Sequence, residues 1–300
     1  MNVQNPAASR GIAIQAVDLV KNYGAGSNMV HALRGVNVSF ERGKFTAIMG
    51  PSGSGKSTLM HTLAGLDSAT SGHILFGGAD LTRMDDKQLT LLRRHKIGFI
   101  FQSFNLLPMF TAEQNILMPL TLAGDKPDRA WFDLLVETLG LKQRLNHRPN
   151  ELSGGQQQRV AIARALIAKP KLVFADEPTG NLDSVSSAEV LGFLKRSVNE
   201  LGQTIVMVTH DAVAASYADR AIVFADGQIV ADEANPTAET MNELLMAERE
   251  RATRTAVTST RADTLARLAG VKDVPNLPIT DAPLPPAGRT GTMRHARAAA

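Results

Sequence analysis

The sequence predicts an α/β fold in which helices cover both faces of a mostly parallel β-sheet. In its second half, helical and strand-like segments alternate, at 154–168 (helix), 172–175 (strand), 188–201 (helix) and 204–208 (strand). In its first half, the apolar strand 45–49 leads through a glycine-rich loop into a helix at 59–63. Strands that alternate with helices are joined by right-handed crossovers, which makes neighbouring strands parallel. These segments therefore predict the core of the domain.

The segments before this core predict an antiparallel β subdomain at the N-terminus. Apolar residues alternate around Ile14 and again around Val38, on either side of the glycine-containing turn 24–28. Alternation with a period of two is typical of half-buried strands. Further strands are expected at 73–76 and 97–101.

A helical insert is expected at about 108–165, between two strands of the core. Trp131, Leu135 and Leu139 recur every four residues, so they share one face of a helix. Later in the chain, Asp226 and Gly227 separate two short apolar segments, which predicts a hairpin.

The folded domain is expected to span residues 1–240. In the extension 241–300, Ala, Arg, Thr and Pro dominate toward the end and the hydrophobic spacing fades. Such a composition is typical of disorder, so this extension is expected to be mostly disordered. A tail that docks on a partner is the alternative.

Composition limits the possible classes of function. With 300 residues and 44% hydrophobic side chains, the chain can bury a large core. It contains no cysteine, which excludes disulfides, zinc-thiolate sites and thiol catalysis and favours a reducing compartment. Neither a signal peptide nor a membrane span is expected, since no apolar segment is long enough.

The net charge of +3 does not indicate a nucleic-acid-binding face. From Arg251 onward there are eight Lys and Arg against three Asp, whereas the preceding residues contain 24 Lys and Arg against 26 Asp and Glu. The basic excess therefore belongs to the tail, and no direct binding of nucleic acid is expected.

A phosphate-binding loop follows the strand 45–49 and opens the next helix. It fits the pattern G-x-x-x-x-G-K-[ST] and comprises Gly50, Pro51, Ser52, Gly53, Ser54, Gly55, Lys56, Ser57 and Thr58. Its glycines allow successive N–H groups to point at phosphate oxygens. Lys56 would meet the β and γ phosphates of ATP, and Ser57 would bind Mg²⁺. The sequence therefore predicts a P-loop NTPase core of the RecA-like type.

Two carboxylates follow the buried strand 172–175. Asp176, at the strand end, is expected to hold Mg²⁺. Glu177 is expected to orient the attacking water or take its proton. These residues predict hydrolysis of ATP in addition to binding.

Further motifs stand in a fixed order along the chain. Gln102 lies in the segment 101–104, Ser153-Gly154-Gly155-Gln156 precedes a helix, and Asp183 and His210 follow the two carboxylates. In this order they resemble the nucleotide-binding subunit of ATP-binding-cassette (ABC) transporters, and the resemblance covers about residues 10–235. It implies an ABC ATPase domain with a helical ABC-specific subdomain.

The resemblance implies a role for each motif. Two subunits pair head to tail in this family, so Ser153, Gly154, Gly155, Gln156 and Asp183 would act in trans on the ATP of a second copy. Gln102 would contact Mg²⁺ and ATP, and His210 would be catalytic beside the γ phosphate. Tyr23 would stack on adenine, with an ordinary strand aromatic as the alternative.

Four segments resemble the lipoprotein-release and macrolide-exporter branch of this family, namely 24–29, 64–67, 101–108 and 176–183. The branch implies a separate transmembrane permease with a large extracytoplasmic domain, and a place on the cytoplasmic face of the membrane through that permease. Apolar residues of 104–110 are hypothesised to line its docking groove. The alternative is a soluble ABC ATPase of a nucleic-acid or ribosome-associated complex, although no long coiled coil separates the motifs.

Overall fold

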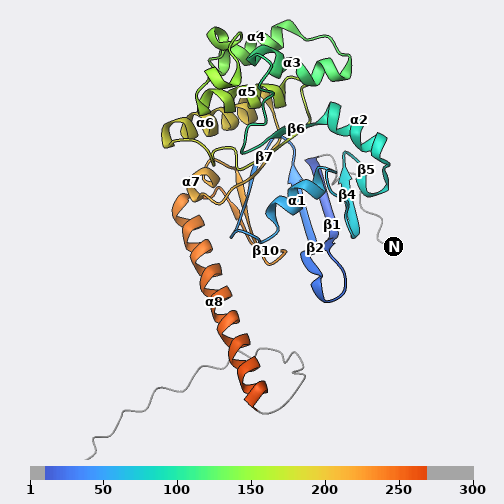
Figure 1. Cartoon of the computed structure of the whole chain (residues 1–300), viewed down its shortest axis with the longest axis vertical. Helices are drawn as coiled ribbons and strands as arrows, with labels where there is room; N and C mark the ends of the chain where they lie inside the picture. The colour runs from blue at the N-terminus through green and yellow to red at the C-terminus, as the bar shows by residue number, and fades with distance from the viewer. Residues whose placement is uncertain (1–10, 269–300) are drawn as a thin grey trace, which may run out of the picture. The chain divides into compact units, whose positions relative to one another are not determined.

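The computed structural model of the chain describes residues 11–268, in which the strands form two sheets (Figure 1). The first sheet is antiparallel, has the order β2-β1-β4-β5, and confirms the N-terminal β subdomain. Its strands are β1 (Ile12–Tyr23), β2 (Val30–Glu41), β4 (Ser71–Phe76) and β5 (Ala79–Asp80). Tyr23 ends β1 and pairs with Val30 across the hairpin.

The second sheet is mostly parallel, as expected, with the order β10-β9-β3-β8-β7-β6 in the described chain. Its strands are β3 (Phe45–Met49), β6 (Ile97–Ile100), β7 (Leu172–Asp176), β8 (Ile205–Val208), β9 (Arg220–Ala225) and β10 (Gln228–Ala234). Only β10 within it is antiparallel, and it forms the expected hairpin with β9 around Asp226 and Gly227.

The parallel sheet separates two hydrophobic cores, because successive side chains of a strand point to opposite faces. On β3, Ala47 and Met49 belong to the core covered by the later helices, whereas Ile48 belongs to the core on the other face. Helix α1 (Lys56–Leu63) contributes Leu59 and Leu63 to that second core, which it shares with the antiparallel sheet. The phosphate loop thus leaves a fully buried strand and enters a well-anchored helix.

The expected helical insert consists of α3 (Ala112–Ala123), α4 (Arg129–Thr138) and the start of α5 (Gly154–Leu166). Leu135 and Leu139 are buried as expected, and Trp131 packs against them at the edge of the same core. The indole N–H of Trp131 donates a hydrogen bond to the carbonyl of Leu166, 3.1 Å away. The insert is therefore joined to the first core rather than separate from it.

The remaining helices are α2 (Asp86–Lys96), α6 (Ser184–Leu201), α7 (Ala212–Ala215) and α8 (Ala238–Leu268). Short 3₁₀ turns occur at Gly26–Asn28, Leu81–Arg83, Lys142–Arg144 and Pro149–Glu151. Helix α2 was not expected from the sequence. Its residues are all at least partly exposed, and Asp85 and Gln88 cap its start reciprocally.

Helix α8 runs from Ala238 to Leu268 and thus continues into the extension 241–300, which was expected to be mostly disordered. Its first turns bury Met241 and pack Leu244 and Leu245 against the first core, which extends the folded part beyond residue 240. The remainder of the extension, 269–300, lies outside the described residues. Within residues 11–268 we find no helix with the length and apolar character needed to cross a membrane.

Candidate active site

The loop after β3 has the backbone geometry of a phosphate cradle. Gly50 and Gly55 adopt φ angles of +149° and +102°. A Cβ atom at Gly50 would lie 1.9 Å from the carbonyl oxygen of Phe224, and one at Gly55 would lie 2.4 Å from that of Ala32. Because both neighbours are backbone atoms that cannot move aside, only glycine fits at these two positions.

Lys56 extends along this loop and donates a hydrogen bond to the carbonyl of Pro51, at 2.7 Å. Burial lowers the pKa of its ammonium group, while the charges of Glu177 and Asp176 oppose that shift. The hydroxyl of Ser54 is buried in the same loop and has no hydrogen-bond partner among the described residues. A charged donor and an unsatisfied hydroxyl in one loop fit an anionic ligand with several oxygens.

A cavity of about 620 Å³ opens beside the loop. Its walls combine phosphate-loop residues 53–58 with Tyr23 at the end of β1 and the Asp226–Gly227 turn. His31 and Arg34 of β2 also line it, and sequence reasoning missed them because nothing in their local pattern marks a ligand site. The volume is typical of small-molecule sites, and an aromatic ring lies beside the phosphate cradle.

Asp176 ends β7, two strands away from β3 in the sheet. Its Oδ1 atom lies 3.5 Å from the Ser57 hydroxyl, and its Oδ2 atom lies 3.9 Å from Nε2 of His61. Burial raises the pKa of the Asp176 carboxyl, against the opposing charge of His61. The two oxygen donors expected to hold the metal are thus brought together from distant segments.

Glu177 stands in a left-handed backbone conformation, with φ +48°, which is strained for a residue with a side chain. Its N–H bonds the carbonyl of Val208, and its own carbonyl accepts from the N–H of Gly180. Nδ1 of His210 lies 2.8 and 2.9 Å from the two carboxylate oxygens. The structure therefore pairs the two expected catalytic side chains directly.

Gln102 follows β6 and is exposed. Its backbone carbonyl accepts a hydrogen bond from the side chain of Asn181, and a Cβ atom at Gly180 would lie 2.7 Å from its amide nitrogen. The fully buried Gln158 of α5 donates to the carbonyl of Pro178 at 2.6 Å. Gln102 and α5 thus both contact the loop that follows Glu177.

Ser153, Gln156 and Asp183 have well-defined partners inside their own chain. Ser153 and Gln156 form a reciprocal capping box at the start of α5. Asp183 caps α6 and also accepts a hydrogen bond from the hydroxyl of Ser186. Within the described chain, none of the three lines the cavity beside the phosphate loop. Their action on a nucleotide of the same chain is therefore not supported.

The docking groove hypothesised at 104–110 stays a prediction. An apolar cavity of about 540 Å³ lies next to that segment and is lined mainly by residues in and around β6, α2, α3 and α5, including Phe99, Phe101, Met118 and Leu122. Of the hypothesised segment, only Asn105 contributes to it. The buried guanidinium of Arg164 lines the same cavity and donates to the carbonyls of Phe104 and Asn105, which holds that segment at the rim.

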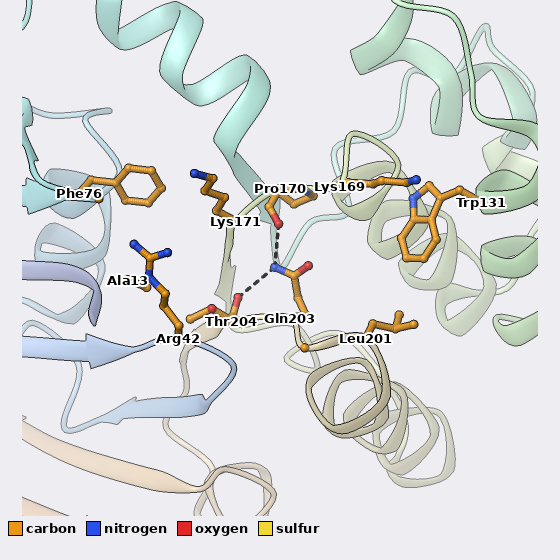
Figure 2. A pocket seen from close by; sticks show the side chains of 12 residues that line it. Ala13, Arg42, Phe76, Trp131, Lys169, Pro170, Lys171, Leu201, Gln203 and Thr204 are labelled. Atoms are coloured by element: carbon orange, nitrogen blue, oxygen red, sulfur yellow. Dashed lines mark hydrogen bonds between the residues drawn. The ribbon is translucent and has the colours of Figure 1, made fainter. Parts of the chain in front are cut away.

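A further cavity of about 490 Å³ lies at the opposite edge of the parallel sheet, where β7 and β8 begin (Figure 2). Figure 2 shows Gln203 donating hydrogen bonds to the carbonyls of Pro170 and Thr204, and Lys169 beside the ring of Trp131. None of the predicted site residues lines this cavity. The phosphate loop and Tyr23 line the cavity of about 620 Å³, whereas Glu177 and His210 line a separate cavity of about 460 Å³. Both lie at the carboxyl ends of the parallel strands, where ligands of open α/β sheets bind.

The fold and this site define a P-loop ATPase with a helical insert, in which Ser153 caps helix α5 at the start of the signature segment 153–156. The family model described as "ABC transporter" matches residues 33–180. LolD of Geobacter metallireducens, a lipoprotein-releasing system ATP-binding protein, is 49% identical over 221 residues, which cover 73% of this chain and 98% of LolD. The chain belongs to the ABC transporter family, in which it is an ATP-binding and ATP-hydrolysing subunit.

Two further relatives confirm the branch and the fold expected from the sequence. MacB of Syntrophobacter fumaroxidans, a macrolide export ATP-binding/permease protein, is 49% identical over 72% of this chain, which spans only 31% of MacB. The dimeric structure of a post-hydrolysis state of the ATP-binding cassette MJ0796, bound to ADP and Pi, matches with a TM-score of 0.68 and 40% identity. It covers 74% of this chain and 98% of that one. These relatives favour the transport role over the non-transport alternative.

Proposed function

We propose that this chain hydrolyses ATP with the residues gathered at the carboxyl ends of β3, β7 and β8, and that it drives a separate permease. One observation carries the proposal: Ser57, the neighbouring pair Asp176 and Glu177, and His210 come from three distant segments, and their side chains approach one another in pairs, Ser57 with Asp176 and His210 with Glu177. Each is the residue type that phosphoryl transfer to water needs at its position.

The donor set fits Mg²⁺ as the cofactor. Ser57 and Asp176 offer two oxygen ligands 3.5 Å apart, and the Asp176 carboxyl, whose pKa is raised by desolvation, is half-buried at the end of β7. No group of three or more His, Cys, Asp and Glu that could hold a metal occurs among the described residues. This fits Mg²⁺, which is usually bound by one or two carboxylates, with phosphate oxygens and water completing its shell. Gln102 would approach the same ion.

The bound metal would neutralise phosphate charge during the reaction. The residues of the chain would bind the nucleotide and activate the attacking water. Lys56 and the loop N–H groups hold the β and γ phosphates, and the Tyr23 ring supports the adenine. Glu177 orients the attacking water and accepts its proton, while His210 holds the Glu177 carboxylate in place.

A second copy of the chain would complete the site. Ser153 is exposed and caps the N-terminus of α5, a position where N–H groups favour an anion. Gly154, Gly155 and Gln156 follow it in the first turn of α5, and Asp183 caps α6, whose Ser186 lies against Gly155. The solved cassette that this chain resembles is a dimer bound to ADP and Pi, which supports a head-to-tail pair with ATP between the phosphate loop and this signature segment.

The permease is expected to dock in the apolar groove between β6, α2, α3 and α5. Leu122, 68% exposed, is the most exposed of the large hydrophobic residues that line this groove. The MacB relative is named an ATP-binding/permease protein, which supports a permease partner, with a large extracytoplasmic domain as in that branch. Through such a partner the chain would lie on the cytoplasmic face of the membrane.

The metal assignment is tested with Asp176→Asn, and the exposed Asp86→Asn of α2 serves as the matched control. ATP turnover is measured over a Mg²⁺ titration, and ATP binding is measured in EDTA. Asp176→Asn should lower turnover by at least about 100-fold and leave metal-free binding in place. If Asp176→Asn turned over ATP like Asp86→Asn at every Mg²⁺ concentration, the assignment would be wrong.

The docking groove is tested with Leu122→Ser, and Leu134→Ser on α4 is the control because Leu134 is also exposed but lies outside the groove. Each variant is purified in detergent with the membrane protein that accompanies the parent chain. Leu122→Ser should lose that protein and Leu134→Ser should keep it. Equal recovery with both variants would contradict the groove assignment.

A further inference from the structure

Tyr23 is held at its hydroxyl by Asp67, the last residue of the segment 64–67. The Tyr23 hydroxyl donates to Oδ2 of Asp67 at 2.5 Å. The other carboxylate oxygen, Oδ1, accepts from the ammonium of Lys21 at 2.6 Å. Lys21 is only 7% exposed, and its ammonium lies 4.8 Å from the centroid of the Tyr23 ring. Asp67 therefore joins a buried cation to the ring that lines the nucleotide cavity.

The same carboxylate is tied to the helix that carries the phosphate loop. The N–H groups of Leu66 and Asp67 both bond the carbonyl of His61 in α1, at 2.9 and 3.3 Å. Lys21 also donates to the carbonyl of Ser68, at 2.7 Å. On the strand side, the N–H of Thr70 bonds the carbonyl of Val20. Asp67 therefore holds the Tyr23 ring in position relative to α1 as well as relative to its own strand, β1.

The charges keep this arrangement in one protonation state. Burial alone would raise the pKa of Asp67, but hydrogen bonds from Lys21 and Tyr23 outweigh it and hold that pKa below its usual value. Burial and the bond to Asp67 raise the pKa of the Tyr23 phenol, against a smaller opposing effect of Thr58. Near neutral pH, Asp67 therefore stays an acceptor and Tyr23 stays a donor.

We propose that Asp67, itself held by Lys21, is a positioning residue that fixes the Tyr23 ring as a platform for the base of the nucleotide. The inference rests on the proposed stacking of adenine on Tyr23. Tyr23 lines the nucleotide cavity, whereas Lys21, whose ammonium lies 4.8 Å from the centroid of the Tyr23 ring, does not.

This role predicts an effect on the base and not on the phosphates. The carboxylate sets the distance between the ring and α1, whereas the phosphates are held by the loop itself. Loss of the hydroxyl contact should let the ring move and weaken ATP binding by about 3- to 10-fold, the usual effect of one hydrogen bond. Affinity for inorganic tripolyphosphate, which has no base, should stay within about twofold.

The test compares Tyr23→Phe, Asp67→Ala and their double variant, with Tyr23→Ala as the probe of stacking itself and Asp86→Asn as the control. Measured quantities are KM and kcat for ATP, and the inhibition constant of tripolyphosphate. Tyr23→Phe and Asp67→Ala should each raise KM by about 3- to 10-fold, with a smaller change in kcat. In the double variant the two effects should not multiply, since both remove one contact. Tyr23→Ala should raise KM further.

The possible failures can be told apart. If Tyr23→Ala raises KM while Tyr23→Phe and Asp67→Ala do not, stacking stands and the positioning role is overturned. If Tyr23→Ala leaves KM unchanged, the proposed stacking fails and the positioning role with it. Equal weakening of tripolyphosphate would make Asp67 a structural residue only. Asp67→Ala removes the carboxylate that pairs with the buried ammonium of Lys21, and this variant could therefore fail to fold. In that case Tyr23→Phe, which removes a single hydroxyl, still tests the positioning role.

Discussion

Replacing Glu177 with Gln separates the binding of ATP from its hydrolysis. The amide has nearly the shape of the carboxylate and keeps an oxygen that can accept a hydrogen bond from His210. The backbone of Glu177 is fixed by bonds to Val208 and Gly180 that the change does not touch. We therefore expect Glu177→Gln to fold like the parent and to keep the phosphate loop intact.

The expected loss of turnover follows from the role assigned to the carboxylate. A positioned general base contributes about 10²- to 10⁴-fold, or about 3 to 5 kcal/mol of activation free energy. An amide cannot take the proton of the attacking water, so the whole of this contribution should disappear from kcat. ATP binding should hold or tighten, because one negative charge is removed near the phosphates and Lys56 is kept.

The assay compares Glu177→Gln with Glu200→Gln, an exposed residue of α6 outside the site. Release of phosphate gives kcat, and gel filtration with Mg²⁺ and ATP gives the oligomeric state. We expect Glu177→Gln to lose at least about 100-fold in kcat and to accumulate as a dimer while ATP is present. A kcat within threefold of the parent would refute the assignment of Glu177.

Two changes test how the site is held. Gly50→Ala should prevent correct folding of the phosphate loop, because its Cβ would lie 1.9 Å from a backbone carbonyl oxygen. Gly77→Ala is the control, since Gly77 has open space around it. This change should lower the free energy of unfolding, measured with denaturant, by only about 1 kcal/mol. Asp219 bonds the ammonium of Lys195 and the N–H of Phe45 at the start of β3, so Asp219→Asn should lower the free energy of unfolding by about 2 kcal/mol at pH 7. Burial would raise the pKa of Asp219, but the hydrogen bond from Lys195 and the other contacts hold that pKa low. The stability that the Asp219 carboxylate contributes is therefore present above about pH 4 and is lost as the pH falls through the lowered pKa. Unfolding curves of the parent and of Asp219→Asn at pH 7 and pH 3 would show this loss. Equal stability of Asp219→Asn and the parent at pH 7 would contradict this role, as would native-like ATP binding by Gly50→Ala.

The parts of the site that the sequence predicts are those set by local backbone chemistry. The loop that begins at Gly50 needs glycine for its φ angles, and Asp176 needs a buried strand before it, so both leave a clear local pattern. Ser153 likewise shows itself as a cap, because a capping box spans only four residues. Because such features span only a few residues, they can be recognised in the sequence before the fold is known.

The parts that sequence reasoning missed depend on contacts between distant segments. Asp67 lies 44 positions from Tyr23, and nothing near either residue marks the pair. The apolar groove draws on four separate elements, so no local pattern in the sequence marks it. Helix α2 is mostly polar and has no buried residue, so it lacks the apolar segment by which the other helices were recognised.

The loop 178–183 connects Glu177 with α5 and with Gln102. It follows the strained Glu177, and the carbonyl of Pro178 accepts a hydrogen bond from the buried side-chain amide of Gln158 in α5. The side chain of Asn181 in the same loop donates to the carbonyl of Gln102, beside the groove. A residue held at φ +48° keeps its conformation only while its surroundings impose it. The position of the carboxylate that we propose orients the water therefore depends on the contacts that Gln102 and α5 make with this loop.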